Sequence, residues 1–312
     1  KGALKDFTDR LRSGDLGMLP VIVGLILIST VFSALNPVFL APNNLVNLLF
    51  DCATVGVISL GIVCVLMLGE IDLSVGSMSG LASALIGVLW ANAGVSLPLA
   101  ILAALACGAL IGAVYALLYN RLGMPSFVST LSGLLAILGL QLYILGPTGS
   151  INLPFTSPLV GFGQLWILPQ WASYLLGLLP GAVMVWVGLS VMKQRQAAGL
   201  SSQPLTRLVL KAAALTVALE GAIYYLHLGR GVPVMFALFV LLAVILNYGL
   251  TRTQWGRSMF AVGGNKEAAR RSGINVRRIY LSAFIMSSTL AALGGILSTS
   301  RLASPSRQAG TG

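Results

Sequence analysis

The stretch from Leu122 to Met192 contains no lysine, arginine, aspartate or glutamate, and residues 126–145 within it read SFVSTLSGLLAILGLQLYIL. About 20 mostly apolar residues are enough for a helix to cross the hydrocarbon core of a bilayer. A soluble domain draws roughly 25% of its residues from the charged types, whereas this chain of 312 residues is 9% charged and 57% hydrophobic. The charge-free stretch therefore predicts an all-α integral membrane protein.

Apolar segments of spanning length recur on both sides of this stretch. They predict a polytopic helix bundle of about nine spans, at residues 16–35, 45–68, 74–93, 97–119, 126–145, 174–192, 206–226, 232–250 and 279–302. We expect a cytosolic N-terminal segment (1–15), followed by a transmembrane helix bundle (16–250). A cytosolic loop (251–278), a further span (279–302) and a tail (303–312) follow. Small residues at helical spacing predict close packing between helices, at Gly76/Gly80, Gly108/Gly112 and Ser287/Ala291/Gly295.

Basic residues gather in alternate connections between the predicted spans. If the N-terminus is cytosolic, 16 of the 19 lysines and arginines fall on the inner side, in residues 1–15, 120–125, 193–211 and 251–278. The positive-inside rule accounts for this bias. The net charge of +11 alone would suit nucleic-acid binding, but its distribution favours a multi-pass protein in contact with lipid, with a cytosolic N-terminus. We expect this protein in the plasma (inner) membrane and expect no nucleic-acid partner.

The longest basic connection contains residues 263–274, which read GGNKEAARRSGI. Asn265 can cap the first free N–H groups of a helix, Glu267 suits the positive end of its dipole, and Gly273 supplies a left-handed stop. A helix this short is unstable alone, because nucleation is unfavourable. A partner protein is one candidate for what holds it, and an ordinary capped surface helix is the alternative.

Two acids interrupt the apolar pattern in residues 69–76, which read GEIDLSVG. A charged group at the bilayer centre costs at least ~2.5–3.5 kcal/mol on insertion scales, so Glu70 and Asp72 need partners, water or an interfacial position. One interpretation is an interrupted helix beside a transport path. The alternative is an interfacial turn in which Asp72 or Ser74 caps the next helix.

Three stretches resemble the permeases of ABC importers for monosaccharides, of the ribose and xylose type. They are residues 71–77 (IDLSVGS), 125–131 (PSFVSTL) and 261–274 (AVGGNKEAARRSGI), and they follow the order of that family. The basic segment 193–211 and the hairpin that continues to residue 233 are similar to the xylose branch. Leu138-Gly139 stands where many members have Arg-Gly, so no role of that arginine is carried over.

This resemblance implies the membrane subunit of an ATP-driven importer for xylose or a related pentose. In the family, a loop with the spacing Glu-Ala-Ala-x-x-x-Gly docks into a cytosolic ATPase subunit, and here the corresponding helix contains Asn265, Glu267, Ala268, Ala269 and Gly273. A Gly-x-x-x-x-Gly-Lys-Ser/Thr phosphate loop does not occur in the sequence. We therefore expect a transport subunit that is not an enzyme and binds no cofactor or metal, with ATP and Mg on partner ATPase subunits. The family also implies a permease dimer, an external sugar-binding protein and further spans beyond the tail.

A path for a neutral sugar calls for neutral polar groups. The candidates for the path and the helix break are Glu70, Asp72, Ser74, Gly76, Ser77, Ser79, Asn47 and Gln141. Two alternatives remain at this point. An ion-coupled secondary carrier would need no ATPase and would use intramembrane acids, among Asp51, Glu70, Asp72 and Glu220. A branched-chain amino acid permease would keep the ABC system and change the substrate.

Overall fold

The fold is a bundle of helices. The computed structural model describes residues 17, 19–147, 149–199, 204–306 and 309–310, and strand pairing in this part of the chain is limited to two isolated bridges. Among these residues, eight helices are long and apolar enough to cross a membrane. The predicted all-α polytopic membrane fold is confirmed.

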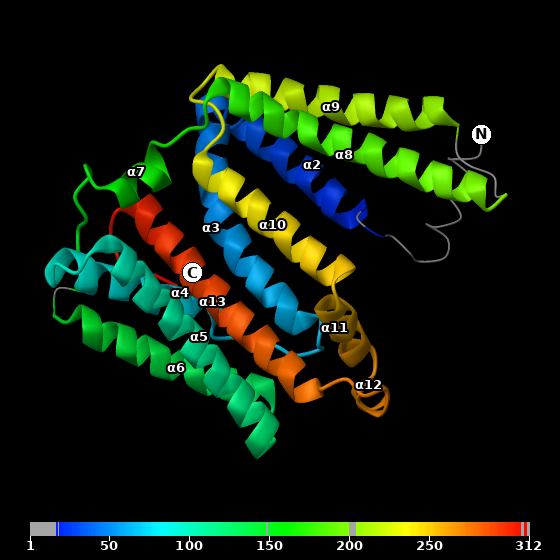
Figure 1. The fold of residues 1–312 in the computed structure, drawn as a ribbon. Helices are drawn as coiled ribbons and strands as arrows, with labels where there is room; N and C mark the ends of the chain where they lie inside the picture. Colours follow the sequence, from blue (N-terminus) through cyan, green and yellow to red (C-terminus); the bar gives the residue numbers. More distant parts are fainter. Residues whose placement is uncertain (1–16, 18, 148, 200–203, 307–308, 311–312) are drawn as a thin grey trace.

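Figure 1 shows the helices in chain order. They are α2 (Leu19–Leu35), α3 (Pro42–Leu66), α4 (Val75–Ile86), the π-helical η1 (Gly87–Asn92), α5 (Leu97–Leu122), α6 (Ser126–Leu145), α7 (Pro158–Gln164), α8 (Gln170–Ala197), α9 (Leu205–His227), α10 (Val234–Arg252), α11 (Gln254–Gly264), α12 (Lys266–Arg271) and α13 (Val276–Leu302). Eight predicted spans correspond to α3, α4 with η1, α5, α6, α8, α9, α10 and α13. The helix in the remaining span, α2, has 17 residues and is shorter than these.

The helix α13 forms the centre of the bundle. It packs against α3, α4 and α5, and 61% of the residues in its apolar stretch are buried. A Cβ atom at Gly108 of α5 would lie 2.7 Å from the carbonyl oxygen of Ser288 on α13. A Cβ atom at Gly112 would lie 2.4 Å from the carbonyl oxygen of Phe284 on the same helix. Glycine at these positions therefore lets two backbones approach closely, and the packing predicted from Gly108/Gly112 is confirmed.

The helices α8 and α9 form a hairpin along one flank of the bundle, separated from α13 by α10 and α3 (Figure 1). Only 11% of the apolar stretch of α8 and 6% of that of α9 are buried. A groove between the two helices is lined by Leu178, Gly181, Ala182, Val185, Val209, Ala212, Ala213, Thr216 and Val217. The rest of the described bundle therefore covers little of this hairpin.

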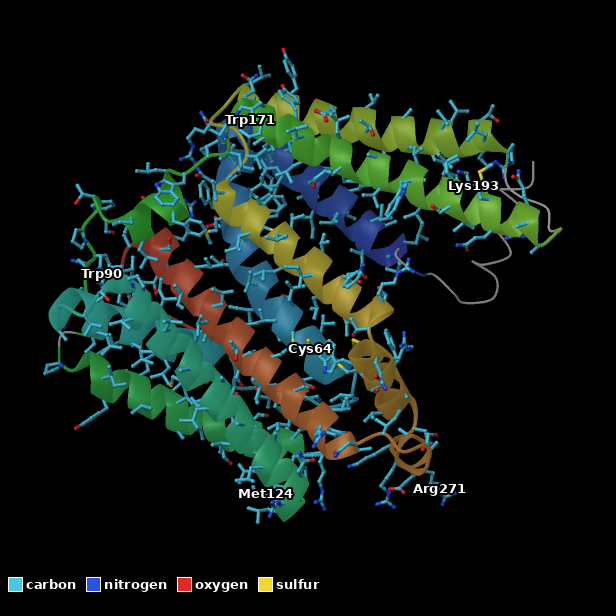
Figure 2. The ribbon with its side chains drawn as sticks, in the orientation of Figure 1. Cys64, Trp90, Met124, Trp171, Lys193 and Arg271 are labelled. Atoms are coloured by element: carbon cyan, nitrogen blue, oxygen red, sulfur yellow. The ribbon has the colours of Figure 1, made fainter. Side chains whose placement is uncertain are left out.

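The basic connections lie at one end of the bundle. Figure 2 shows Met124, Lys193 and Arg271 toward this end, and Trp90 and Trp171 toward the other. We call it the basic end; it contains the ends of α5 and α8, the starts of α6 and α9, and the α10–α13 connection. This is the arrangement that the positive-inside rule requires. That the basic end faces the cytosol stays a prediction.

Candidate functional site at the basic end of the bundle

The predicted interruption near residues 69–76 is an irregular connection between two helices. The helix α3 ends at Leu66 and α4 begins at Val75, and we call residues 67–74 the linker. Gly69 has a φ of +75°, in the left-handed region that glycine enters without a Cβ penalty. Since α3 and α4 with η1 are each long enough to span a membrane, the linker joins two spans and does not divide one helix.

Glu70 is the partly buried acid of the linker, and side chains from three helices donate to it. Its Oε1 accepts hydrogen bonds from the hydroxyls of Tyr119 on α5, at 2.6 Å, and Tyr280 on α13, at 3.3 Å. Its Oε2 accepts one from the hydroxyl of Ser126, at the start of α6, at 2.5 Å. Hydrogen bonds to a charged group contribute ~1.5–3 kcal/mol each, so these three donors stabilise the carboxylate at its position.

Asp72 is the buried acid of the linker, with 6% of its surface exposed. Its Oδ1 accepts from the backbone N–H of Ser74 at 2.9 Å and from the Ser74 hydroxyl at 2.7 Å. Its Oδ2 accepts from the hydroxyl of Ser287 on α13 at 2.9 Å. The sequence offers Asp72 and Ser74 as caps for the helix that follows. Asp72 accepts a hydrogen bond from the N–H of Ser74, the residue before α4, whereas the Ser74 side chain makes no capping hydrogen bond. Asp72 therefore ties the start of α4 to α13.

The backbone of the linker also binds the first turns of α6. The N–H of Leu73 donates to the Thr130 hydroxyl oxygen at 3.2 Å, and the N–H of Ile71 lies 3.4 Å from the Ser126 hydroxyl oxygen. Backbone groups outside a helix need such partners when they are buried. Two of the stretches that carry the family resemblance, 71–77 and 125–131, therefore meet in space.

The helix α12 has the caps that the sequence predicts. The Asn265 side-chain oxygen accepts from the N–H of Ala268 at 2.9 Å, and Gly273 has a φ of +84° just after the helix. Glu267 and Arg270 form an ion pair of 2.8 Å on its surface. An exposed pair of this kind adds little stability, so the caps and the packing determine where the helix begins and ends.

The two faces of α12 differ. Ala269 is 4% exposed and packs into the hydrophobic core around α13. Glu267 and Ala268 are exposed, as is Gly273 beyond the helix. The bundle thus holds one face of α12 and leaves the other face on the surface of the basic end.

The loop formed by α11 and α12 touches the linker and its tyrosine partners. The Lys266 Nζ donates to the Tyr119 hydroxyl oxygen at 3.2 Å and lies 4.8 Å and 5.1 Å from the ring centroids of Tyr119 and Tyr280. The two rings stack with centroids 4.4 Å apart. On α11, a Cβ atom at Gly263 would lie 1.9 Å from the carbonyl oxygen of Met67, so the two backbones are in direct contact.

The polar path candidates do not all lie together. Ser77 donates to the carbonyl of Ser74, and Ser79 to that of Gly76, so both hydroxyls bind their own helix. Gln141 of α6 is fully buried; its Nε2 donates to the carbonyls of Ser306 and Ala309, and its Oε1 has no hydrogen-bond partner among the described residues. A Cβ atom at Gly76 would lie 2.6 Å from the carbonyl oxygen of Gly310, so Gly76 and Gln141 contact the same tail.

Asn47 and the two remaining acids occupy other places. The Asn47 side-chain oxygen accepts from Arg230 on the α9–α10 connection, toward the other end of the bundle. Asp51 pairs with Arg301 at 2.8 Å. Glu220 on α9 lies in the α8–α9 hairpin, and its Oε1 is buried with no hydrogen-bond partner in the described part of the chain.

Of the partners of the two linker acids, Tyr119, Tyr280 and Ser287 are not among the site residues predicted from the sequence, whereas Ser74 is. Tyr119 and Tyr280 lie near the basic ends of apolar spans, where tyrosines are common because they suit the membrane interface. Ser287 was assigned only a packing role. The sequence does indicate that Glu70 and Asp72 need hydrogen-bond donors if they lie within the membrane. That need points to hydroxyl side chains near the ends of other spans as their partners.

Comparison with known proteins gives one family. Residues 44–312 match the family described as "Branched-chain amino acid transport system / permease component". The chain is 36% identical over 303 residues to the xylose transport system permease protein of Escherichia coli K12, covering 96% of this chain and 76% of that protein. It is 28% identical over 292 residues to the ribose import permease protein of the same strain, covering 93% and 72%. It is 32% identical over 310 residues to that strain's probable ABC transporter permease protein YphD, covering 99% and 73%. No solved structure matches.

The eight apolar helices, the capped loop helix and these relatives define a permease, the membrane-spanning subunit of an ABC importer. Such a subunit transports and is not itself an enzyme. The chain belongs to the permease family that contains the xylose and ribose permeases named above. Membership of this family confirms the resemblance found in the sequence and excludes the secondary-carrier alternative.

Proposed function

We propose that this chain is the membrane subunit of an inner-membrane importer for xylose or a related pentose, with its basic end and N-terminus in the cytosol. The relatives named for xylose and ribose transport support a sugar substrate over a branched-chain amino acid. An ATPase subunit docks on α12 and carries ATP and Mg. An external sugar-binding protein delivers the substrate, and a second permease chain completes the membrane unit.

The observation that carries the docking proposal is the helix α12. It has 6 residues, is capped at its start by Asn265, and packs on the bundle through Ala269. A helix this short does not persist without such support. Its exposed face carries Glu267 and Ala268, so the bundle presents this face rigidly to a partner in solution.

Closure of the ATPase subunits on ATP moves α12 and changes which side of the membrane the path faces. Gln141 is the path candidate with the strongest support. Its Oε1 is a buried acceptor without a partner among the described residues, and a sugar hydroxyl is a donor that satisfies such a group. A Cβ atom at Gly80 of α4 would lie 2.4 Å from the Gln141 Oε1, so this part of α4 lies directly beside the Gln141 side chain.

Exchange of one residue on α12 and of the glycine that follows this helix tests the docking. The double variant Glu267→Ala, Gly273→Ala should lose sugar uptake by more than about tenfold and should no longer co-purify with the ATPase. Gly123→Ala is the matched control, because Gly123 also ends a helix at the basic end with a left-handed φ of +66° and has nothing within 4 Å of its missing Cβ. Normal uptake and normal co-purification of the double variant would refute the docking site.

Cysteine labelling tests the orientation. Arg271→Cys, in a chain whose Cys52, Cys64 and Cys107 are replaced by alanine, should react with an impermeant maleimide only after the cells are opened. Reaction in intact cells would reverse the assigned topology.

Uptake assays test the substrate and the energy source. Xylose uptake, measured with the ATPase and the binding protein present, should be competed by other pentoses and not by leucine. It should require ATP and should persist when the proton gradient is collapsed. Competition by leucine alone would move the assignment to an amino acid.

A further inference from the structure

We propose that Lys266, Tyr119 and Tyr280 connect α12 to Glu70, so that displacement of α12 is transmitted through the linker to the start of α4. This inference rests on the proposed docking of the ATPase on α12. In this proposal the three residues are positioning residues, which lie between the docking surface on α12 and the helix α4.

A single phenol hydroxyl lies between two opposite charges. The Lys266 ammonium donates to the Tyr119 oxygen at 3.2 Å, and the Tyr119 hydroxyl donates to Glu70 at 2.6 Å. Each bond polarises the next, and a chain of this kind is stronger than its separate bonds. Lys266 also lies over the faces of both tyrosine rings, where the ring quadrupole attracts a cation. The Tyr119 hydroxyl therefore binds both Lys266 and Glu70.

The α11–α12 loop and its tyrosine partners hold the first half of the linker at two points, Met67 and Glu70. Tyr280 is 2% exposed, stacks on Tyr119 and donates to the same carboxylate oxygen. Three residues before Lys266, the backbone of Gly263 contacts the carbonyl of Met67 at the first residue of the linker. A shift of the α11–α12 loop must therefore move the linker or break one of these contacts.

The linker continues directly into α4. Asp72 accepts from the N–H of Ser74, the residue before α4, and is fixed to α13 through Ser287. The helix α4 with η1 is buried over 56% of its apolar stretch and contains the path candidate Ser77. The two states that the proposal requires are a linker held through Lys266 and a linker released from it.

The test separates transmission from docking. Tyr119→Phe keeps the ring stack and removes the bridging hydroxyl, and Lys266→Met keeps an apolar side chain of similar length and removes the charge. In proteoliposomes that contain the permease, the ATPase and the binding protein, we expect the amount of sugar transported per ATP hydrolysed to fall by about 2- to 30-fold, the range of coupling residues. Co-purification of the ATPase should be unchanged, and Lys266→Arg should restore part of the ratio.

The controls are an exposed tyrosine and an exposed lysine elsewhere. Tyr143→Phe on α6, where Tyr143 is 84% exposed, and Lys211→Met on α9 should leave the ratio unchanged. If Tyr119→Phe is poorly folded, Tyr280→Phe removes the other tyrosine hydroxyl that donates to Glu70 and also keeps the ring stack. A wild-type ratio in both tyrosine variants and in Lys266→Met would overturn the link while leaving the docking site intact. Loss of ATPase co-purification in Lys266→Met would also overturn it, because Lys266 would then belong to the docking surface itself.

Discussion

The helices α13 and α9 are both apolar and long enough to span a membrane, yet they differ in how much of each the rest of the bundle buries. In α13, which is 61% buried over its apolar stretch, the Tyr280 and Ser287 hydroxyls donate to the two acids of the linker. In α9, which is 6% buried, Glu220 has an oxygen without a partner among the described residues. Hydropathy identifies both helices as spans, but the packing around each determines which polar residues hold the structure together.

The largest expected difference concerns a glycine in each helix. A Cβ atom at Gly295 of α13 would lie 2.0 Å from the carbonyl oxygen of Ser79, whereas at Gly221 of α9 nothing lies within 4 Å. Gly295→Leu should destabilise the protein by about 3 kcal/mol or more, at the upper end of overpacked cores, and Gly221→Leu should have almost no effect. Thermal unfolding in detergent measures both. Equal stability of the two variants would mean that α13 is not packed against α4 as described.

The next effect concerns Asp72, which accepts three hydrogen bonds. Asp72→Ala leaves the Ser74 and Ser287 donors unpaired and should lower stability by about 2–3 kcal/mol, with impaired uptake. Asp72→Asn should be milder, because its amide oxygen still accepts from the Ser74 N–H and its amide group can donate to the Ser287 oxygen. If Asn is as harmful as Ala while both variants remain folded, the charge itself is required and the structural role given to this carboxylate is wrong.

The smallest effect is expected at Glu220. Because its Oε1 lacks a partner among the described residues, Glu220→Gln should change stability by no more than about 0.5 kcal/mol. Uptake should be unaffected. A variant that folds normally and no longer transports would give the α8–α9 hairpin a direct part in transport, and would bring α9 closer in character to α13.

Much of the fold could be predicted from the sequence because the membrane restricts the possibilities. Eight predicted spans coincide with helices to within a few residues, since hydropathy and charge segregation report the same physical boundary. The caps of α12 were also predictable, because Asn265 and Gly273 act on neighbouring backbone groups. The linker was recognised as irregular for the same local reason: two acids and Gly69 interrupt an apolar run.

The cluster around the linker could not be predicted, because its members are distant in the sequence. Tyr119 and Tyr280 meet only through the packing of α5 on α13, and no local pattern relates them. Lys266 was counted among the positive-inside charges, which explains its side of the membrane and not its contact with two rings. Asn47 and Gln141 were grouped by polarity alone, and they lie on different helices with different partners.

The distance along the chain between Glu70 and its donors also has a consequence for biosynthesis. Tyr280 lies 210 residues after Glu70, and Ser287 lies 215 residues after Asp72. At ~5–20 residues per second, the ribosome supplies α13 roughly 10–40 s after the linker has emerged. During that interval the two acids lack their α13 donors. The linker therefore gains its full set of hydrogen bonds only after α13 has been made and has packed against α3 and α5.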